Sequence, residues 1–234
     1  MRAAYCTAPH KIELRDVPPP TPAPGDVLVR VHACGICGSD LHYFNGAAPP
    51  PSVCLGHEIV GHVASDAGGF TEGEPVVIEP LLACRSCPRC QAGQPNLCAN
   101  LRILGSMAPG GLEELVAVPR ETLYRLPAGL DLGSAMLAEP LAVGVHAAHV
   151  GAIAPGDDVL VLGAGAIGLL AAFAAVRSGA QVTVSARGAG FTAAIGVETL
   201  SVDGVEASNI DGRQGSDTFT VNDLTTSVLR QINL

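Results

Sequence analysis

Residues 157–187 read DDVLVLGAGAIGLLAAFAAVRSGAQVTVSAR, and this stretch decides the fold class of the chain. DDVLVLG has the continuous apolar run of a buried strand, GAGAIG is a turn, and LLAAFAAVRSG is an apolar helix that ends at Gly179. QVTVSAR then supplies a second strand. A parallel strand pair needs a crossover connection, usually a helix, so the stretch predicts half of a parallel α/β sheet.

The turn between the first strand and the helix has the pattern G-x-G-x-x-G, with Gly163, Gly165 and Gly168. Glycine permits the tight turn and lets the backbone and the helix N-terminus approach a pyrophosphate. Between a strand and a helix the motif predicts a dinucleotide site that also includes Ala166 and Ile167. The alternative is a tight turn in an Ala-rich sheet that holds no ligand.

The end of the second strand bears on the choice of dinucleotide. NAD-binding units place an Asp or Glu there to hold the ribose 2′-hydroxyl. This strand instead ends Ser185-Ala186-Arg187, and Arg187 suits a 2′-phosphate. The sequence therefore favours NADP over NAD, with a solvated turn arginine as the alternative.

Residues 1–155 differ in composition from the rest and hold every Pro, Cys and His of the chain. The segments 26–33, DVLVRVHA, and 58–64, EIVGHVA, alternate like half-buried strands. Short strands broken by Pro and Gly predict an irregular β-rich domain. A net charge of −9 without a basic stripe argues against nucleic acid or an anionic membrane as partner. The absence of a long apolar run and of a secretory leader leads us to expect a cytoplasmic protein.

Four cysteines lie close together in the run CRSCPRCQAGQPNLC, with the spacing C-x2-C-x2-C-x7-C. Four thiolates can surround one tetrahedral Zn²⁺ at about 2.3 Å per Zn–S bond and leave no open position. Such a site is structural. The alternatives are a pair of disulfides or four unrelated thiols, which a reducing compartment and CxxC repeats disfavour. The predicted structural zinc ligands are Cys84, Cys87, Cys90 and Cys98.

A second set of metal-ligating residue types is spread over a hundred positions, in GICGSDLHYF, LGHEIVG and AEPLAVGVHAA. Cys37, His57 and Glu139 offer a thiolate, an imidazole and a carboxylate, a donor set that suits Zn²⁺. Three protein ligands would leave a fourth position for a substrate hydroxyl, whose pKa the metal lowers. Taken singly, each residue has an ordinary structural explanation.

Taken together, these motifs and their order are similar to those of the zinc-dependent medium-chain dehydrogenases. The chain resembles the polyol branch, which includes sorbitol and L-idonate 5-dehydrogenases, over residues 1–187. The resemblance implies an α/β protein with a β-rich N-terminal part. A GroES-like zinc-binding catalytic domain would span residues 1–155, and a partial Rossmann unit would span 156–187. It also implies two zinc ions, NADP or NAD, a small polyol or alcohol as substrate, and a homo-oligomer.

The resemblance also implies roles for single residues. Cys37, His57 and Glu139 would bind the catalytic zinc, and Glu58 would lie beside it, in the second shell or as an exchanging ligand. Ser39 matches the hydroxyl that takes the substrate proton, and His42 the relay that passes it to solvent, which its ordinary pKa suits. Asp40 would orient a ligand.

Residues 188–234 depart from the family pattern. Short alternating runs separated by Gly, Asp and Asn predict a β-rich tail, and residues 212–220 match a calcium-type nonapeptide repeat only in part.

Because the family pattern stops after the second strand, we expect a truncated or fused Rossmann unit of two parallel strands. The leading functional hypothesis is an oxidoreductase that moves a hydride between an alcohol and NAD(P), impaired by the truncation. The alternative is a catalytically silent zinc-binding remnant that holds no nicotinamide cofactor.

Overall fold

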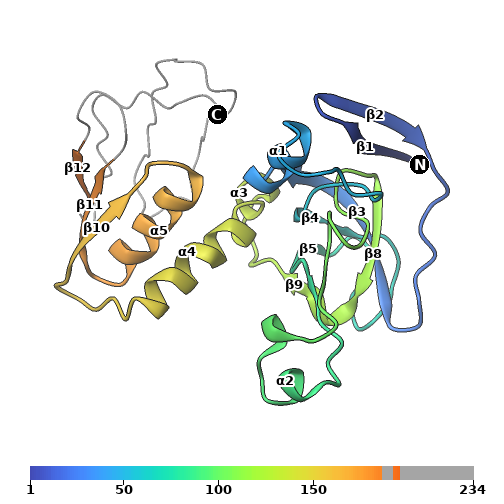
Figure 1. Cartoon of the computed structure of the whole chain (residues 1–234). Coiled ribbons are helices and arrows are strands. Elements are labelled where there is room, and N and C mark those ends of the chain that lie inside the picture. Colours follow the sequence, from blue (N-terminus) through green and yellow to red (C-terminus); the bar gives the residue numbers. More distant parts are fainter. Residues whose placement is uncertain (186–191, 196–234) are drawn as a thin grey trace. The chain divides into compact units, whose positions relative to one another are not determined.

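The structure is a computed structural model that describes residues 1–185 and 192–195. The chain divides into two compact units, Met1–Glu139 and a second that begins at Pro140. Figure 1 shows the elements of each unit along the chain. Within the described residues, no helix has both the length and the apolar character needed to span a membrane.

A five-stranded antiparallel sheet organises the first unit, in the order β8-β3-β4-β5-β9. Its strands are β3 (Asp26–Gly35), β4 (Glu58–Val63), β5 (Pro75–Ile78), β8 (Leu115–Pro119) and β9 (Leu123–Arg125). The strands predicted from alternation at 26–33 and 58–64 are confirmed as β3 and β4. They are neighbours in the sheet, and Gly35 pairs with Glu58 at one end of the shared ladder.

Branched aliphatic side chains fill the core of this unit, as expected for a chain with only 3% aromatic residues. β3 buries every second side chain at Val27 and Val29, the period that places residues on one face of a sheet. Each fully buried Val or Ile contributes about 1.5–3 kcal/mol. The least exposed members of this core are Val27, Val29, Ile59, Val76, Ile78, Val116 and Val118.

Shorter elements surround the sheet. A hairpin at the N-terminus joins β1 (Arg2–Ala8) to β2 (Lys11–Asp16), and α1 (Gly38–Phe44) follows β3 directly. η2 (Arg120–Thr122) and α3 (Leu132–Ala135) complete the second half of the unit. A separate lobe contains β6 (Leu81–Leu82), α2 (Pro88–Gln91), η1 (Pro95–Leu97) and β7 (Arg102–Ile103).

The second unit contains the predicted strand–turn–helix–strand. β10 (Asp158–Leu162) pairs in parallel with β11 (Gln181–Ser185), and α5 (Ala166–Arg177) connects them. The helix ends where the sequence predicts, because Gly179 adopts a left-handed φ of 89° that a helix cannot continue through. The side chains that pack between α5 and β11 are Ala172, Ala175, Val176, Val182 and Val184.

The helix α4 (Ala138–Val150) explains why the second unit begins earlier than the expected boundary at residue 155. Only Pro140, Gly144 and Ala148 are buried on it, four residues apart along one face. A Cβ at Gly144 would lie 2.7 Å from the backbone carbonyl of Leu170 in α5. The glycine therefore allows close helix packing, and this packing draws most of α4 into the second unit.

The sheet of the second unit has a third strand that the sequence does not predict as part of it. β12 (Thr192–Ile195) pairs antiparallel with β11, so the two-stranded parallel sheet expected for this part is wrong. Arg187 and the repeat-like segment 212–220 lie outside the described residues. The cofactor preference and the calcium alternative based on them stay predictions.

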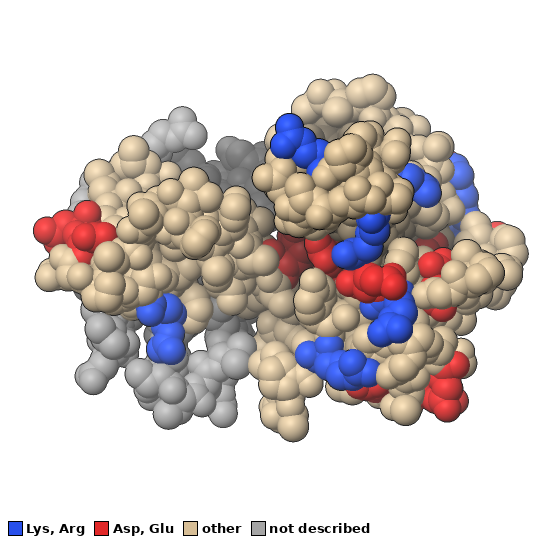
Figure 2. All heavy atoms as spheres, turned by 90° about the horizontal axis from the view of Figure 1, so that it is seen from below, with Lys and Arg blue, Asp and Glu red and all other residues tan. Residues whose placement is uncertain are grey.

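Charged side chains of both signs mix on the face of the molecule shown in Figure 2, where Lys and Arg lie among Asp and Glu. Ion pairs between neighbouring groups, such as Arg2–Glu114 and Lys11–Glu13, are exposed to solvent. Exposed pairs of this kind contribute about 0–1 kcal/mol. The stability of the first unit therefore rests on its buried aliphatic core rather than on surface charge.

Candidate metal centres and nucleotide turn

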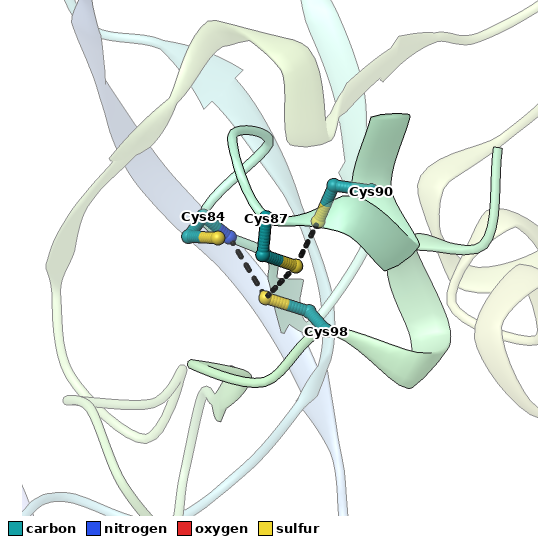
Figure 3. A group of neighbouring side chains, drawn as sticks. All are labelled: Cys84, Cys87, Cys90 and Cys98. Carbon is teal, nitrogen blue, oxygen red and sulfur yellow. Dashed lines mark hydrogen bonds between the residues drawn. The ribbon is translucent and has the colours of Figure 1, made fainter. Parts of the chain in front are cut away.

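Four cysteine sulfurs converge in the lobe below the sheet of the first unit (Figure 3). The cysteine lobe is defined here as residues 84–100. Cys87 caps the N-terminus of α2, Cys90 lies within that helix, and Cys98 ends η1. The four Sγ atoms all lie within 4.8 Å of one another. This arrangement brings together all four residues that the spacing predicts as one group.

The distances within the cysteine lobe fit a tetrahedral metal. The Sγ of Cys87 lies 3.5 Å from that of Cys90 and 3.9 Å from that of Cys98. Sulfurs at the corners of a Zn–S tetrahedron lie about 3.8 Å apart when each bond is about 2.3 Å. All eight cysteines of the chain are free thiols, so the disulfide alternative is not realised in this structure.

Backbone N–H groups of the lobe point at sulfur and favour thiolates. The amides of Cys84 and Asn100 donate to the Sγ of Cys98 at 3.2 and 3.3 Å. Hydrogen bonds from the backbone N–H groups of Ser86 and Cys87 lower the pKa of Cys84 to about 5. Burial and the neighbouring thiols raise the pKa of Cys90 to about 12. Crowded thiolates of this kind are stabilised together by a divalent cation, which requires the deprotonated ligands.

A second group of donors forms where β3 and β4 meet. Cys37 lies two residues beyond the end of β3 and precedes α1, while His57 and Glu58 stand at the start of β4. The Sγ of Cys37, a ring nitrogen of His57 and a carboxylate oxygen of Glu58 lie within 4.8 Å of one another. These residues are called the three-donor group below. A thiolate, an imidazole and a carboxylate form a chemically suitable set for Zn²⁺.

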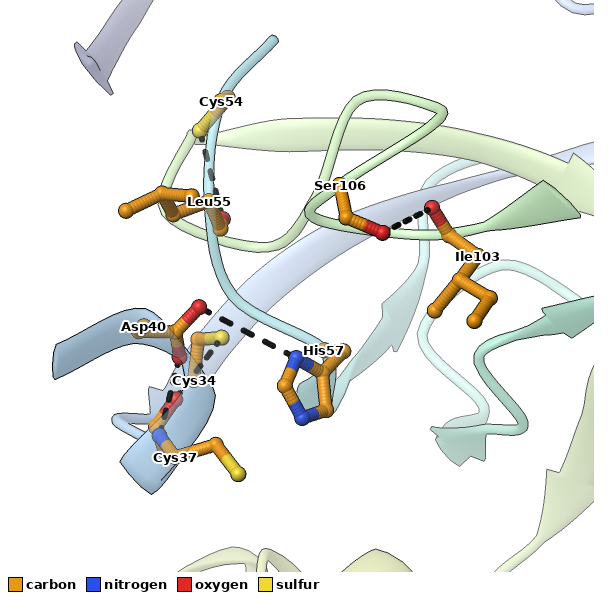
Figure 4. A network of polar contacts seen from close by, with 9 residues as sticks. Cys34, Cys37, Asp40, Cys54, Leu55, His57, Ile103 and Ser106 are labelled. Atoms are coloured by element: carbon orange, nitrogen blue, oxygen red, sulfur yellow. Dashed lines mark hydrogen bonds and ion pairs between the residues drawn. The ribbon is translucent and has the colours of Figure 1, made fainter. Parts of the chain in front are cut away.

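A buried carboxylate, Asp40, holds two members of this group in place (Figure 4). Its side chain is 4% exposed, and its Oδ2 accepts a hydrogen bond from the backbone N–H of Cys37 at 2.9 Å. Its Oδ1 lies 4.0 Å from the Nδ1 of His57. One carboxylate thus contacts the start of α1 and faces the imidazole, which agrees with the orienting role proposed for it from the sequence.

The charges of the three-donor group favour a cation. A hydrogen bond from His57 holds the pKa of Cys37 below its ordinary value, and the bond together with nearby carboxylates raises the pKa of His57 to about 9. Burial raises the pKa of Glu58, and the charge of Glu139 adds to this effect. The same hydrogen bond thus favours the thiolate of Cys37 and the protonated ring of His57, and a bound cation would replace the proton between them.

Glu139 lies near this group without joining it. It is the second residue of α4, and burial raises its pKa. Its charge reaches His57 and Glu58, yet the set of donor atoms within 4.8 Å contains Glu58 rather than Glu139. The sequence hypothesis has the opposite order, with Glu139 as ligand and Glu58 beside it. The identity of the third ligand stays a proposal.

Ser39 and His42, the residues expected to transfer a proton, both lie on α1. Both side chains are exposed to solvent. A hydrogen bond from Ser39 contributes to the lowered pKa of Cys37, so the start of α1 places the Ser39 hydroxyl against the thiolate. The structure leaves their catalytic roles as predictions.

A glycine-rich segment that the sequence reasoning missed holds the loop before His57. The amides of Gly110, Gly111 and Leu112 donate to the carbonyls of Cys54, Gly56 and Leu55 at 2.9, 2.9 and 3.0 Å. A Cβ at Gly110 would meet the carbonyl oxygens of Gly56 and Leu55, and one at Gly105 would lie 2.8 Å from the backbone nitrogen of Gly56. Three glycines within seven residues of LGSMAPGGLEEL were the available signal, although they do not reveal which loop is contacted.

The nucleotide turn has the backbone geometry that its motif predicts. Gly163 has a φ of 116°, which favours glycine, and its amide donates to the carbonyl of Ser185 at 2.7 Å. A Cβ at Gly168 would overlap the carbonyl oxygen of Gly163. Gly165 caps α5, and nothing lies within 4 Å of a Cβ added there. The turn is tight on one side and leaves the N-terminus of a twelve-residue helix open for an anion.

Comparison with known proteins agrees with these features. Residues 23–128 match the alcohol dehydrogenase GroES-like domain. A zinc-type alcohol dehydrogenase-like protein of Haemophilus influenzae is 36% identical over 186 residues, which are 77% of this chain and 54% of that protein. L-galactonate-5-dehydrogenase of Escherichia coli is 38% identical over 192 residues, which are 79% of this chain and 56% of that enzyme.

A solved structure shows the same architecture. A zinc-binding dehydrogenase of Sinorhizobium meliloti bound to NADP is 39% identical and superposes with a TM-score of 0.73, over 80% of this chain and 56% of that one. The chain thus spans about half the length of the relatives it matches. The expected fold class, a GroES-like domain followed by part of a Rossmann unit, is confirmed. Residues 23–128 therefore match the GroES-like domain of alcohol dehydrogenases, and most of the chain is similar to zinc-type alcohol and polyol dehydrogenases.

Proposed function

We propose that the chain forms the metal-binding part and the first nucleotide-binding elements of a dehydrogenase that oxidises a polyol or secondary alcohol with NADP or NAD. The observation that carries this proposal is the three-donor group, whose thiolate, imidazole and carboxylate lie within 4.8 Å of one another beside the orienting Asp40. Relatives named as polyol dehydrogenases support the substrate class.

Each residue of the site has a role in this proposal. Cys37, His57 and Glu58 hold a zinc ion, and Asp40 fixes the first two. Zinc at such a site supplies Lewis-acid chemistry that makes an alcohol hydroxyl easier to deprotonate. Glu139 lies near enough for its charge to raise the pKa of Glu58.

In this proposal the proton and the hydride of the alcohol go to different groups. Ser39 takes the proton of the substrate hydroxyl as it gives up its own, and His42 passes the released proton to solvent, which its position on the exposed part of α1 allows. A bound nicotinamide would accept the hydride from the carbinol carbon. The turn around Gly165 binds the pyrophosphate of the cofactor through the open N-terminus of α5. The cysteine lobe holds a second zinc that only supports the fold.

The cofactor preference rests on the strand end at Ser185, which lacks the acidic residue typical of NAD-binding units. Similar structures are known with either cofactor: the Sinorhizobium meliloti protein was solved with NADP, and an Escherichia coli dehydrogenase was solved with NADH. We propose that this chain binds NADP more tightly than NAD.

Fluorescence titration of zinc-loaded protein with NADPH and NADH tests the proposed function. We expect saturable binding of NADPH and weaker binding of NADH. The matched variant is Gly165→Ala, because an added Cβ there touches no protein atom within 4 Å but occupies the side from which a pyrophosphate approaches. It should weaken NADPH binding at an unchanged melting temperature. Absence of binding at millimolar cofactor would contradict the proposal and favour a zinc-binding protein without dehydrogenase activity.

A further inference from the structure

Gly35 is the last residue of β3 and is buried. It pairs across the sheet with Glu58, the first residue of β4 and a member of the three-donor group. The φ angle of Gly35 is not positive, so any amino acid could adopt its backbone conformation. The need for glycine at this position must therefore come from its surroundings rather than from its dihedral angles.

The space beside Gly35 is occupied by the side chain of Glu58. A Cβ built on Gly35 would overlap the Oε2 carboxylate oxygen of Glu58 and would lie 3.0 Å from its Cβ and Cδ. No other residue has an atom among these three nearest contacts. The carboxylate thus lies across the glycine, in the volume that a side chain at position 35 would fill.

This placement directs the carboxylate toward the other two donors. Gly35 stands two residues before Cys37, and Glu58 follows His57 directly. The pairing of Gly35 with Glu58 therefore brings the residues of the three-donor group together at one end of the β3–β4 ladder. With any side chain at position 35, the Glu58 carboxylate must rotate away from its present location. The thiol and the imidazole would then lose the oxygen that lies within 4.8 Å of them.

We infer that Gly35 is a positioning residue of the metal site: its missing side chain provides the space that lets the Glu58 carboxylate reach Cys37 and His57. This inference rests on the proposed function, since it assigns a purpose to the carboxylate in a metal-binding group. It also implies that the metal site needs a glycine at position 35 in addition to the three donor residues.

Metal binding by Gly35→Ala tests the inference, with Gly38→Ala as its matched control. Gly38 is three residues away, has no positive φ, and nothing lies within 4 Å of a Cβ added to it. Zinc content and competition titrations with a chromophoric chelator would be measured on both variants. We expect Gly35→Ala to bind the second zinc equivalent about 10- to 100-fold more weakly, the range typical of lost ligand positioning. Gly38→Ala should bind both equivalents as the unaltered chain does.

Replacement of zinc by Co²⁺ adds a readout that general destabilisation would not change. The visible absorption of the Co²⁺ in the three-donor group should change in intensity and position in Gly35→Ala, because an oxygen ligand is displaced. The absorption from the cysteine lobe should stay the same. An unchanged spectrum with unchanged affinity would overturn the inference and leave the proposed function intact.

A double variant separates this steric effect from misfolding. In metal-free protein, any loss of melting temperature caused by Gly35→Ala should largely disappear when Glu58→Ala is also present, because the displaced atoms are gone. Equal losses in both backgrounds, or failure of the double variant to fold, would overturn the inference. If the unaltered chain binds only one zinc, the proposed function itself fails, and the Gly35 inference fails with it.

Discussion

The cysteine lobe and the three-donor group both gather soft metal donors, but their residues lie at very different distances along the chain. The lobe takes all four sulfurs from residues 84–98, around the short helix α2. The three-donor group combines Cys37 with His57 and Glu58, which stand at the ends of two strands that meet only because the sheet pairs them. A local turn and a metal ion are enough to order the first group, whereas the second depends on the register of the whole sheet.

The supporting contacts differ in the same way. Sulfur atoms of the lobe accept hydrogen bonds from the backbone of the lobe itself, as in the bonds from Cys84 and Asn100 to Cys98. The loop before His57 is held by Gly110 and Gly111, more than fifty residues further along the chain. Damage to the lobe should therefore affect its own zinc first, and damage to the sheet or its glycine contacts should affect the other site.

The largest effect should follow from breaking the lobe. Cys87→Ser removes one of four sulfurs and leaves an incomplete zinc site, and a structural zinc contributes directly to folding free energy. We expect the loss of one zinc equivalent and a loss of stability above about 4 kcal/mol, measured by metal analysis and thermal unfolding. Gln91→Ser, an exposed change in the same helix, is the control. An unchanged melting temperature would refute the structural role.

The next largest effect should come from the contact between the glycine-rich segment and the loop before His57. Gly110→Ala places a Cβ against the carbonyl of Leu55 at 2.5 Å and against Gly105 at 2.6 Å. Such overpacking should cost about 3 kcal/mol in chemical denaturation. It should also lower zinc occupancy of the three-donor group while the cysteine lobe keeps its zinc. Pro109→Ala, a change at the exposed residue before Gly110, is the control. Equal loss of zinc from the cysteine lobe and the three-donor group would contradict the expectation that the two sites are supported independently.

Removal of single carboxylates decides the third ligand. Glu58→Ala should weaken binding of the second zinc about 100-fold, equivalent to about 2.7 kcal/mol, because it removes a donor atom of the group. Glu139→Ala should weaken it less, because that carboxylate contributes only charge at the present geometry. Chelator competition on folded protein measures both. The reverse order of effects would make Glu139 the ligand, as the sequence comparison with the family suggests.

The smallest effect should be a pH dependence of the sheet unit that comes from the half-buried carboxyl of Glu113. Burial raises the pKa of Glu113 from 4.5 to about 7, so the folded state prefers the protonated carboxyl. Its favourable contribution is complete below about pH 4.5 and is lost as the pH rises through 7. Partial exposure reduces the effect to about 1 kcal/mol between pH 5 and 8.

Replacement by an uncharged side chain of the same shape measures this contribution. Glu113→Gln should unfold with a free energy that falls less between pH 5 and 8 than that of the unaltered chain, in urea titrations at matched ionic strength. The exposed neighbour supplies the control, because Glu114→Gln should keep the original pH dependence. Parallel pH profiles for the unaltered chain and Glu113→Gln would show that the burial of this carboxyl has no energetic consequence.

Local patterns predicted the larger elements well. Alternation located β3 and β4, and the stretch from Asp158 to Ser185 supplied the strand, turn, helix and strand in the right order. The spacing of four cysteines predicted their convergence. In each case the residues that form the feature are close together in the sequence, so their spacing restricts how they can be arranged in space.

Other features could not be derived in this way. The antiparallel partner of β11, the packing of α4 through Gly144 and the contact of Gly110 with the loop before His57 join segments far apart in sequence. Composition gives no register for such contacts. The resemblance to a family predicts Glu139 as a zinc ligand, while the paired strands bring Glu58 within 4.8 Å of Cys37 and His57.

By itself the sequence determined the four-cysteine lobe and the glycine turn, because spacing within a short segment restricts where side chains and backbone amides can go. Through the resemblance of its motifs to a family, it also predicted Cys37 and His57 as metal donors, and the structure brings their donor atoms close together. Only the tertiary structure brings the carboxylate of Glu58 close to them and places it across Gly35. The pairing of Gly35 with Glu58 accounts for both features, because the strand register determines which side chains lie next to each other.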